Sequence, residues 1–564
     1  MRKLINIACT ALLAMTPLVA GAAERVGDFS LLDENGYFHH MSWYDDHQAI
    51  AFLVQANGSS ATLDALPEFS QLKSRYESQG IEFFLINPMG LKNRDDVKAE
   101  MQEHSIDIRI LMDDAQIVSE AMGIDKTGEA FLYNPKTFTI EYRGPVGAQL
   151  EKAIMAMRDG EAVTEPVVAT SGDPVSYAFT TASVSYEKDV APIIAENCAD
   201  CHREGGIAPF AMNSHAMLQG WSPMIREVVM TKRMPPAQVD PHVGDFANDM
   251  NIDDAAVQKL VSWIDAGSPK DGASDPLAQL TWPESEWAFG EPDYIINVPE
   301  QSIPATGVLD YIRIEVPIDI EEDKWVRGSQ YIAGDRTVLH HTINRVVAPD
   351  GDRQTRGGSD DVANIGAYIP GAEPRLEPSN TGGLLKKGSK LSLNMHYTTN
   401  GKETTDASRI GLWFYPDGVV PEERMSGECA CIFTADWNDI PAFDPNFEQS
   451  SSVTVERDAY LYGHGAHMHF RGKYMRHYAH YPDGTSELLI NIANYSYNWQ
   501  LSYKYSEPKF IPAGTVLTAV GAFDNSPQNP ANPDPSIDVS WGEQSWDEMF
   551  FGSSQWKYVD QGGD

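Results

Sequence analysis

The sequence predicts a multidomain protein with an α/β domain, a small all-α domain and two antiparallel β-sandwiches, in that order. Three observations predict this architecture. The chain has 564 residues, too many for one ordinary domain. Residues 24–165 alternate patterns typical of buried strands and helices, and a short helical region follows. Beyond residue 276, short alternating runs are separated by Gly, Pro, Asn and Asp, as in antiparallel β-sandwiches.

Residues 1–23 have the pattern of a secretory signal peptide. A positive start is followed by a short apolar run and by small residues at 20–22 that suit cleavage. A membrane anchor is the alternative, which the short run and the cleavage signal disfavour. No other segment approaches the roughly 20 apolar residues that span a bilayer. We therefore expect a periplasmic or secreted protein without a membrane span after cleavage. Its formal charge of −39 argues against nucleic acid as a partner.

The region 24–165 contains two near-continuous apolar runs, "IAFLVQA" and "IEFFLINP", as buried parallel strands require. It resembles the thioredoxin-like fold of the peroxiredoxin and redoxin families. Those families place a reactive cysteine after the first buried strand, where this chain has "NGSSAT" with Ser59. Because a serine hydroxyl cannot supply a thiolate, we expect a scaffold or docking domain; residual peroxidase activity is the alternative. Residues 166–185 are rich in Ser, Thr, Ala and Pro and read as a linker.

The motif "CADCH" contains Cys198, Cys201 and His202. The pattern C-x-x-C-H attaches c-type haem through two thioethers, with the histidine as axial ligand. Half of a zinc site and a thiol redox pair are the alternatives. Residues 186–275 resemble cytochrome c, which implies a methionine as second axial ligand. Met234 in "KRMPPAQ" is favoured because two prolines stiffen its loop. The competing methionines are Met212, Met217, Met224 and Met230.

The two predicted sandwiches, 276–420 and 421–564, carry clustered histidines. His467 and His469 in "HMH" are two residues apart, so on a strand they share one face. His340 and His341 in "TVLHHTINR" are adjacent and would point to opposite faces, so a shared metal needs a bulge or different ring nitrogens. Two further elements are His396 in "LNMHYTTNG" and Met549 in "WGEQSWDEMFFG".

Residues 290–555 resemble the copper type II, ascorbate-dependent monooxygenases, whose members include peptidylglycine α-hydroxylating monooxygenase and dopamine β-monooxygenase. The resemblance rests on H-H, H-Y, H-x-H-x-x-G-K and D-E-M in that order. It implies two copper ions facing each other across a solvated cleft. An electron-transfer copper would be bound by His340, His341 and His396, and an oxygen-activating copper by His467, His469 and Met549. Imidazole suits copper and a thioether favours Cu(I), whereas zinc is the rival metal.

The chain departs from the peptide-hydroxylating members at two positions. Ser553 stands where they have a tyrosine for the substrate carboxylate, and Asn394 stands where they have a glutamine. A C-terminal glycine peptide is therefore disfavoured as the substrate. Arg471 and Lys473, in "FRGK", are expected to be solvated. Two cysteines in "CAC", Cys429 and Cys431, would form a strained and readily reduced disulfide if they are bonded. Two unremarkable thiols, a structural bridge and an additional soft-metal site are the alternatives.

These patterns together predict a copper monooxygenase that hydroxylates a C–H bond of a small organic substrate with O2. The electrons would come from ascorbate, from a periplasmic donor, or through the covalently bound c-type haem. A non-catalytic copper and haem electron-transfer or copper-binding protein is the alternative. A binding module led by the N-terminal domain is a third interpretation.

Overall fold

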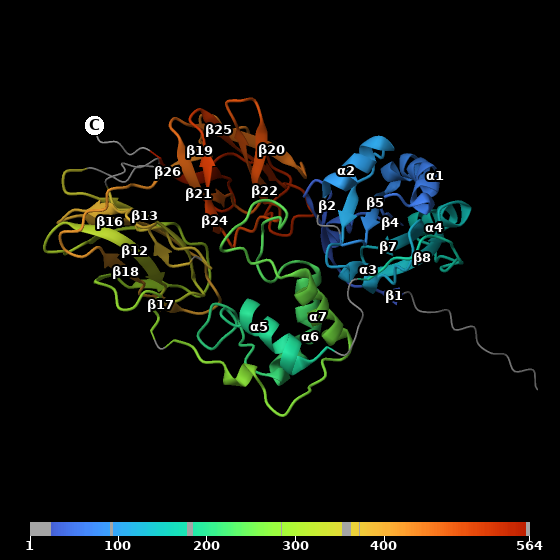
Figure 1. Cartoon of the computed structure of the whole chain (residues 1–564), viewed down its shortest axis with the longest axis horizontal. Coiled ribbons are helices and arrows are strands. Elements are labelled where there is room, and N and C mark those ends of the chain that lie inside the picture. The colour runs from blue at the N-terminus through green and yellow to red at the C-terminus, as the bar shows by residue number, and fades with distance from the viewer. Residues whose placement is uncertain are drawn as a thin grey trace, which may run out of the picture.

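The computed structural model describes residues 24–90, 94–177, 184–283, 285–351, 362–371 and 373–559 (Figure 1). The predicted signal peptide, residues 1–23, lies outside the described residues. Within them, no helix is both long enough and apolar enough to cross a membrane.

The N-terminal part is an α/β domain built on one eight-stranded sheet. The strand order is β1-β8-β7-β4-β5-β6-β2-β3, with β4, β5 and β6 parallel. Every residue of β4 is buried because helices cover both faces of the sheet centre. The predicted α/β alternation is therefore confirmed. The elements are β1 (Glu24–Arg25), β2 (Ser30–Asp33), β3 (Phe38–His40), η1 (Met41–Tyr44), β4 (Ala49–Val54), α1 (Ser60–Tyr76), η2 (Glu77–Gln79), β5 (Ile81–Asn87), α2 (Arg94–Glu103), β6 (Ile110–Met112), α3 (Ile117–Ala121), β7 (Glu129–Asn134), β8 (Thr139–Pro145) and α4 (Ala148–Arg158).

The described part of the predicted linker, residues 166–177, lies along this domain. The Val168 N–H donates to the Arg143 carbonyl (2.9 Å), and the Thr127 N–H donates to the Asp173 carbonyl (2.9 Å). These backbone bonds hold the segment in place, so this part is not a free linker, contrary to expectation. Its Ser-, Thr- and Pro-rich composition gave no sign of this pairing.

Residues 184–283 contain helices joined by long loops. Helices α6 and α7 begin at side-chain caps, Ser214 and Asp253. The loop between them reaches the C-terminal sandwich, where Val239 pairs with Ile492. The elements are a π-helical turn η3 (Tyr186–Val190), α5 (Ala191–Asn197), α6 (His215–Met230), α7 (Asp254–Asp265) and η4 (Leu277–Gln279).

The next part, the first sandwich, has two main antiparallel sheets. One has the order β11-β16-β13; the other is β14-β12-β18-β9, with β15 also paired to β12. Apolar side chains from both sheets form one core. The strands are β9 (Tyr294–Asn297), β10 (Gln301–Ile303), β11 (Ile312–Pro317), β12 (Lys324–Ile332), β13 (Leu339–Val347), β14 (Arg375–Leu376), β15 (Gly383–Leu385), β16 (Lys390–Tyr397), β17 (Thr404–Asp406) and β18 (Arg409–Phe414).

The C-terminal part, the second sandwich, has two four-stranded antiparallel sheets, β19-β26-β21-β24 and β20-β25-β22-β23. The predicted change to antiparallel β structure is thus confirmed for both C-terminal parts. The strands are β19 (Ser426–Ile432), β20 (Phe447–Val455), β21 (Ala459–His467), β22 (Gly472–His480), β23 (Ser486–Ile492), β24 (Ser502–Ile511), β25 (Thr515–Phe523) and β26 (Phe550–Tyr558).

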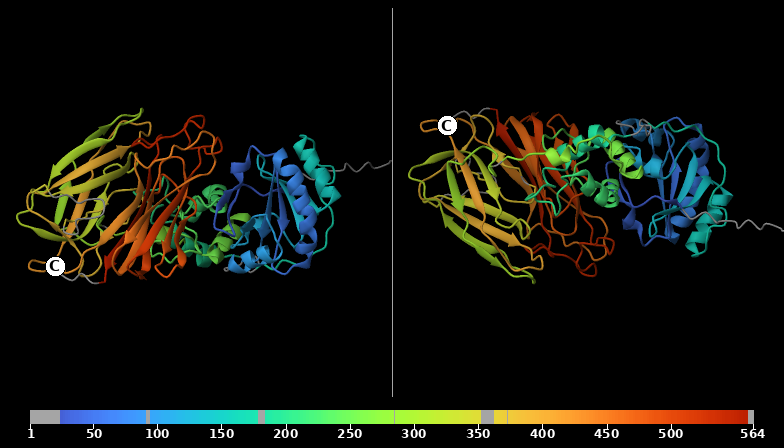
Figure 2. Two further views of the ribbon diagram at one scale, coloured as in Figure 1. Left: turned by 90° about the horizontal axis from the view of Figure 1, so that it is seen from above. Right: turned by 90° about the horizontal axis from the view of Figure 1, so that it is seen from below.

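The order of the parts in space differs from their order in the chain. The second sandwich lies between the first sandwich and the N-terminal domain (Figure 2). At the junction, the side-chain amide of Asn491 donates to the Gly36 carbonyl (2.8 Å). The backbone carbonyl of Asn491 accepts a hydrogen bond from the Asp240 N–H (2.8 Å). The Asp240 carboxylate is paired with Arg94 (2.7 Å) in a buried contact. Three parts of the chain are therefore fixed together at one polar junction.

Candidate metal centres

The first histidine cluster is built on neighbouring strands of the first sandwich. His341 on β13 lies opposite His396 on β16. The pairing register shifts between Leu339 and His341, which places His340 at a bulge. Because a bulge breaks the strict alternation of side chains, His340 and His341 can reach the same centre. A bulge, one of the two arrangements that the sequence analysis allowed for these adjacent histidines, is therefore present.

These three imidazoles are close enough to hold one metal ion. One ring nitrogen of each lies within 4.8 Å of the other two, and all three side chains are buried. Burial, together with nearby histidines, lowers the pKa of His340 and of His396 to about 4. Both rings are therefore neutral at pH 7 and have a lone pair to offer. His340 Nε2 is buried and has no hydrogen-bond partner among the described residues, which is expected of an atom that binds a metal.

Two tyrosines that the sequence analysis did not identify surround this cluster. The Tyr311 ring stacks on His396 with centroids 4.6 Å apart, and its hydroxyl is 3.2 Å from His341 Nε2. Tyr497 stacks on His340 with centroids 4.5 Å apart. Neither tyrosine belongs to a recognisable motif, and Tyr497 comes from the second sandwich, so no local signal could have found them.

The second histidine pair lies at the end of β21. His467 is its last residue, and the ring of His469 stands nearly perpendicular to that of His467 with centroids 5.1 Å apart. His469 Nδ1–H donates to the Asp547 carbonyl (3.1 Å), and His467 Nδ1–H donates to Gln500 Oε1. These bonds fix each tautomer and leave Nε2 with its lone pair. Burial lowers the pKa of His469 to about 3.

Met549 follows a residue whose side chain binds the backbone of this pair. The buried Glu548 carboxylate accepts hydrogen bonds from the N–H groups of His469 (2.8 Å) and Arg471 (2.7 Å). Phe551 on β26 is registered opposite His467, and Met549, two residues earlier, is expected on the same side. The side chain of Met549 is buried. Glu548 and Phe551, on either side of Met549 in the sequence, thus each contact one histidine of the pair.

Arg471 is buried, although the sequence analysis expected its side chain to be solvated. Its Nε–H donates to Asn525 Oδ1 (2.9 Å), and its Nη1–H donates to the Trp546 carbonyl (2.8 Å). The side chain fastens the segment before Met549 to the strand pair β21–β22. A charged residue inside a polar-looking motif gave no hint of this burial.

The two clusters adjoin each other instead of facing across a cleft. The ring centroids of His341 and His467 are 6.2 Å apart. A cavity of about 450 Å³ opens beside them, between the sandwiches, and both rings line it. Other lining residues are Ile343, Asn364, Ile369, Arg375, Glu377, Met425, Gln500 and Phe551. The resemblance implied a solvated separation that this close packing of the sandwiches does not leave.

The "CADCH" motif lies at the end of α5. Among the described residues Cys198 and Cys201 are free thiols. His202 Nδ1–H donates to the Phe210 carbonyl (3.0 Å), so its Nε2 keeps a lone pair for a metal. The ring of Phe210 stacks in turn on Trp221 of α6. Two available thiols beside an oriented imidazole are the groups that a covalent haem requires.

Met234 is not placed with this motif. It follows α6 and lines a cavity of about 400 Å³ between the N-terminal domain and the helices, in which no described lining residue belongs to "CADCH". Met212, one of the competing methionines, packs in the same core as Cys198, and its N–H donates to the His202 carbonyl (2.7 Å). The two prolines after Met234 indicate a stiff loop, but they do not show whether that loop lies near "CADCH".

Ser59, at the position expected for a redox cysteine, has a structural role. It caps the N-terminus of α1, and its hydroxyl contacts Thr127 Oγ1 (2.7 Å) and Asp173 Oδ2 (3.0 Å). The chain has no cysteine between residues 10 and 197. The domain therefore has no thiol of its own.

Comparisons with known proteins identify one part of the chain. Residues 22–149 match the AhpC/TSA family. Similar solved structures include a hypothetical protein from Sinorhizobium meliloti, with 22% identity over 28% of this chain and 95% of that chain (TM-score 0.23). Peroxidoxin BcpB from Mycobacterium tuberculosis has 14% identity over 24% of this chain and 96% of that chain (TM-score 0.22). A thiol:disulfide interchange protein from Chlorobium tepidum has 17% identity over 25% of this chain and 99% of that chain (TM-score 0.22). No curated protein matches the chain.

Proposed function

We propose that this chain, whose N-terminal part is a thioredoxin-like redoxin (AhpC/TSA) domain, is an exported copper-dependent monooxygenase. It hydroxylates a C–H bond of a small organic molecule with O2. The observation that carries the proposal is the convergence of five histidines from both sandwiches beside one cavity. Their order along the chain resembles that of the copper type II, ascorbate-dependent monooxygenases.

The donor sets fit two copper ions. His340, His341 and His396 would hold one ion, because their ring nitrogens already lie within 4.8 Å of each other. His467, His469 and Met549 would hold the other, and a thioether favours Cu(I) over zinc. Bound copper would supply the one-electron redox chemistry that oxygen activation needs.

The surrounding residues would position and shield the reactants. Gln500 orients His467, and Tyr311 and Tyr497 cover the faces of His396 and His340. The cavity volume of about 450 Å³ suits a small molecule. Its wall combines amides, from Asn364 and others, with apolar side chains, so it would hold a substrate with both a polar group and a hydrocarbon portion.

A c-type haem attached to Cys198 and Cys201, with His202 as axial ligand, would supply electrons. Burial raises the pKa of the Cys201 thiol, and the charge of Arg336 acts against this effect. Arg336 lies four residues before His340 in the chain, so Cys201 lies near the segment that leads into the first cluster. Ascorbate or a periplasmic donor would reduce the haem or the copper from outside. The pattern of residues 1–23 supports a location in the periplasm or outside the cell.

Oxygen incorporation tests the proposal. The copper-loaded full-length protein would be incubated with ascorbate, ¹⁸O2 and a panel of small amines, amides and hydrocarbons. We expect substrate-dependent O2 uptake and one labelled oxygen in the product. Substituting His396→Asn or His467→Asn should abolish both, whereas His480→Asn, a change at an exposed histidine of β22, should leave them intact. Bound copper without any uptake across the panel would instead support the electron-transfer alternative.

A further inference from the structure

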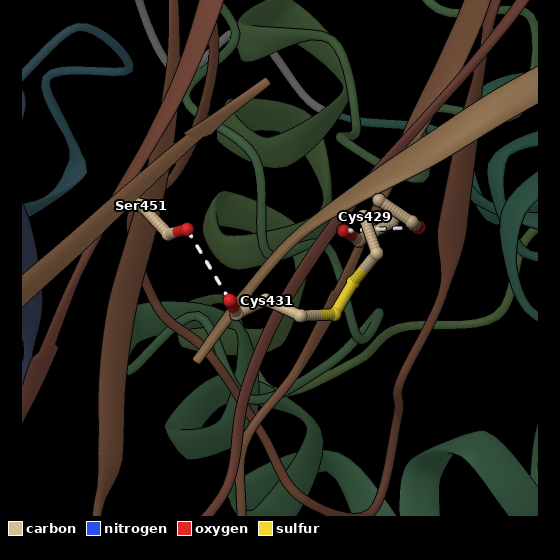
Figure 3. The surroundings of a disulfide bond; sticks show 5 residues. Cys429, Cys431 and Ser451 are labelled. Atoms are coloured by element: carbon tan, nitrogen blue, oxygen red, sulfur yellow. Dashed lines mark hydrogen bonds between the residues drawn. A yellow bond between two sulfur atoms is a disulfide. The ribbon is translucent and has the colours of Figure 1, made fainter. Parts of the chain in front are cut away.

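The two cysteines of the second sandwich form a disulfide on β19 (Figure 3). Cys429 and Cys431 are two residues apart on one strand, so their side chains project from the same face. Both are half-buried, and both line the cavity beside the histidine clusters. The alternate residue, Ala430, points into the sandwich core.

Strand register places this disulfide in line with a predicted metal ligand. Cys431 lies opposite Phe551 on β26, and Phe551 lies opposite His467 on β21. The three residues therefore form one row across the sheet, with Cys431 about 10 Å from His467 at the usual strand spacing. The Phe551 ring stacks on His467 with centroids 5.6 Å apart.

A purely structural role explains this bridge poorly. The stabilisation from a disulfide grows with the loop that it closes, and here the bridged residues are only two positions apart. Little conformational entropy of the unfolded chain is removed by so short a loop. Its place on a cavity wall gives reactants access to the sulfur atoms, which a stabilising bridge does not require.

We propose that Cys429 and Cys431 are a redox-active pair that delivers electrons to metal held by the cavity histidines. This inference rests on the proposed copper function. In the delivering step the two thiols lose two protons and two electrons, the S–S bond forms, and two bound copper(II) ions gain one electron each. In the restoring step two molecules of a low-molecular-weight thiol reduce the bridge and leave as their own disulfide.

Thiol counting and copper spectroscopy test the delivering step without a substrate. The full-length protein and the variant Cys429→Ser/Cys431→Ser would be reduced with a phosphine, desalted under argon and titrated for thiols. We expect the wild type to have two more thiols per chain than the variant. Two equivalents of copper(II) sulfate would then be added, with the haem spectrum recorded so that electrons from iron are counted separately.

In the wild type, we expect the two extra thiols and the copper(II) EPR signal to disappear together. The half-time of this loss should be unchanged by tenfold dilution. The variant should keep its copper(II) signal. Wild-type protein whose reduced pair has been blocked with iodoacetamide should behave like the variant, which provides a second comparison if the substitutions impair folding. A half-time that lengthens in proportion to dilution would overturn the inference, because the electrons would then pass between molecules.

The copper content after desalting separates this inference from the proposed function. Retained copper(II) with unreacted thiols in the wild type would overturn the inference alone. Failure of the protein to retain copper would overturn the proposed function and, with it, the role of the cysteine pair.

Discussion

The ring of Tyr497 is stacked on the ring of His340, with centroids 4.5 Å apart and planes 20° from parallel. His340 belongs to the first sandwich, whereas Tyr497 lies between β23 and β24 of the second. The Tyr497 hydroxyl is 2.6 Å from Ser545 Oγ and 3.4 Å from His396 Nδ1. One side chain therefore ties the second sandwich to the first histidine cluster.

Replacing Tyr497 should separate its two contributions. Tyr497→Phe keeps the stacked ring and loses the hydroxyl, so we expect about 1 kcal/mol less stability and nearly unchanged copper binding. Tyr497→Leu removes the ring that orients His340, and copper affinity at one site should fall by about 10–100-fold. Urea unfolding and competition with a copper(I) chelator measure the two effects. Tyr460→Leu, at an exposed position of β21, is the matched control. Equal copper affinity in Tyr497→Leu and wild type would contradict the orienting role.

The buried pair His464 and His477 should make stability depend on pH. Burial lowers the pKa of His477 from its usual 6.5 to about 4, and it lowers the pKa of His464 in the same direction. Below pH 6.5 these two histidines are therefore protonated in the unfolded chain but stay neutral in the folded chain. The free energy of unfolding should therefore fall as the pH drops from 6.5 towards 4, by up to about 1.4 kcal/mol per unit from His477.

Urea unfolding of metal-free protein at several pH values tests this dependence. The variant His477→Gln should show a shallower slope between pH 6.5 and 4 than the wild type, with little difference above pH 7. Identical slopes for the two proteins would mean that His477 does not titrate as its burial requires.

Ser59 should matter for stability and not for catalysis. Ser59→Ala removes the cap of α1 and the contacts with Thr127 and Asp173, so we expect a loss of about 1–2 kcal/mol. Metal-free, haem-free protein with Ser59→Ala should consume peroxide in the presence of a thiol reductant at the same rate as protein with Ser59, because the redoxin domain has no cysteine. A slower rate in Ser59→Ala would contradict the scaffold interpretation.

The proposed haem should stay on the unfolded chain, because thioether bonds to Cys198 and Cys201 survive denaturation. Met212 packs in the core that holds Cys198, and Met234 lines another cavity. Met212→Ala should therefore change the haem absorption spectrum, with Met234→Ala as the comparison. A spectral change in Met234→Ala alone would show that the loop after α6 moves to the iron, as the sequence analysis favoured.

The clustering of the histidines could be predicted because it depends on local rules. His467 and His469 are only two residues apart, although β21 ends at His467, so their closeness follows from their spacing. Alternation along β13 implies that adjacent His340 and His341 need a bulge or different ring nitrogens to share a metal, and a bulge is present at His340. The α/β alternation of the first domain follows equally from buried apolar runs such as β4.

Other features depend on contacts between distant segments, which no local pattern encodes. Tyr497 meets His340 only because the second sandwich packs on the first, and the Asn491 junction requires the C-terminal part to lie beside the N-terminal domain. The burial of Arg471 depends on carbonyl and amide groups at residues 525 and 546. Patterns within one segment could not place these partners.

Copper content tests the central claim most directly. Full-length protein loaded with copper(I) and dialysed against a weak chelator should retain two ions per chain, measured by elemental analysis. Met549→Ala should retain one ion, because the other site keeps His340, His341 and His396, and His396→Asn should likewise retain one. His480→Asn should retain both. Two ions in the wild type with one in each ligand variant is the predicted result, and a wild type that retains no copper would contradict the account.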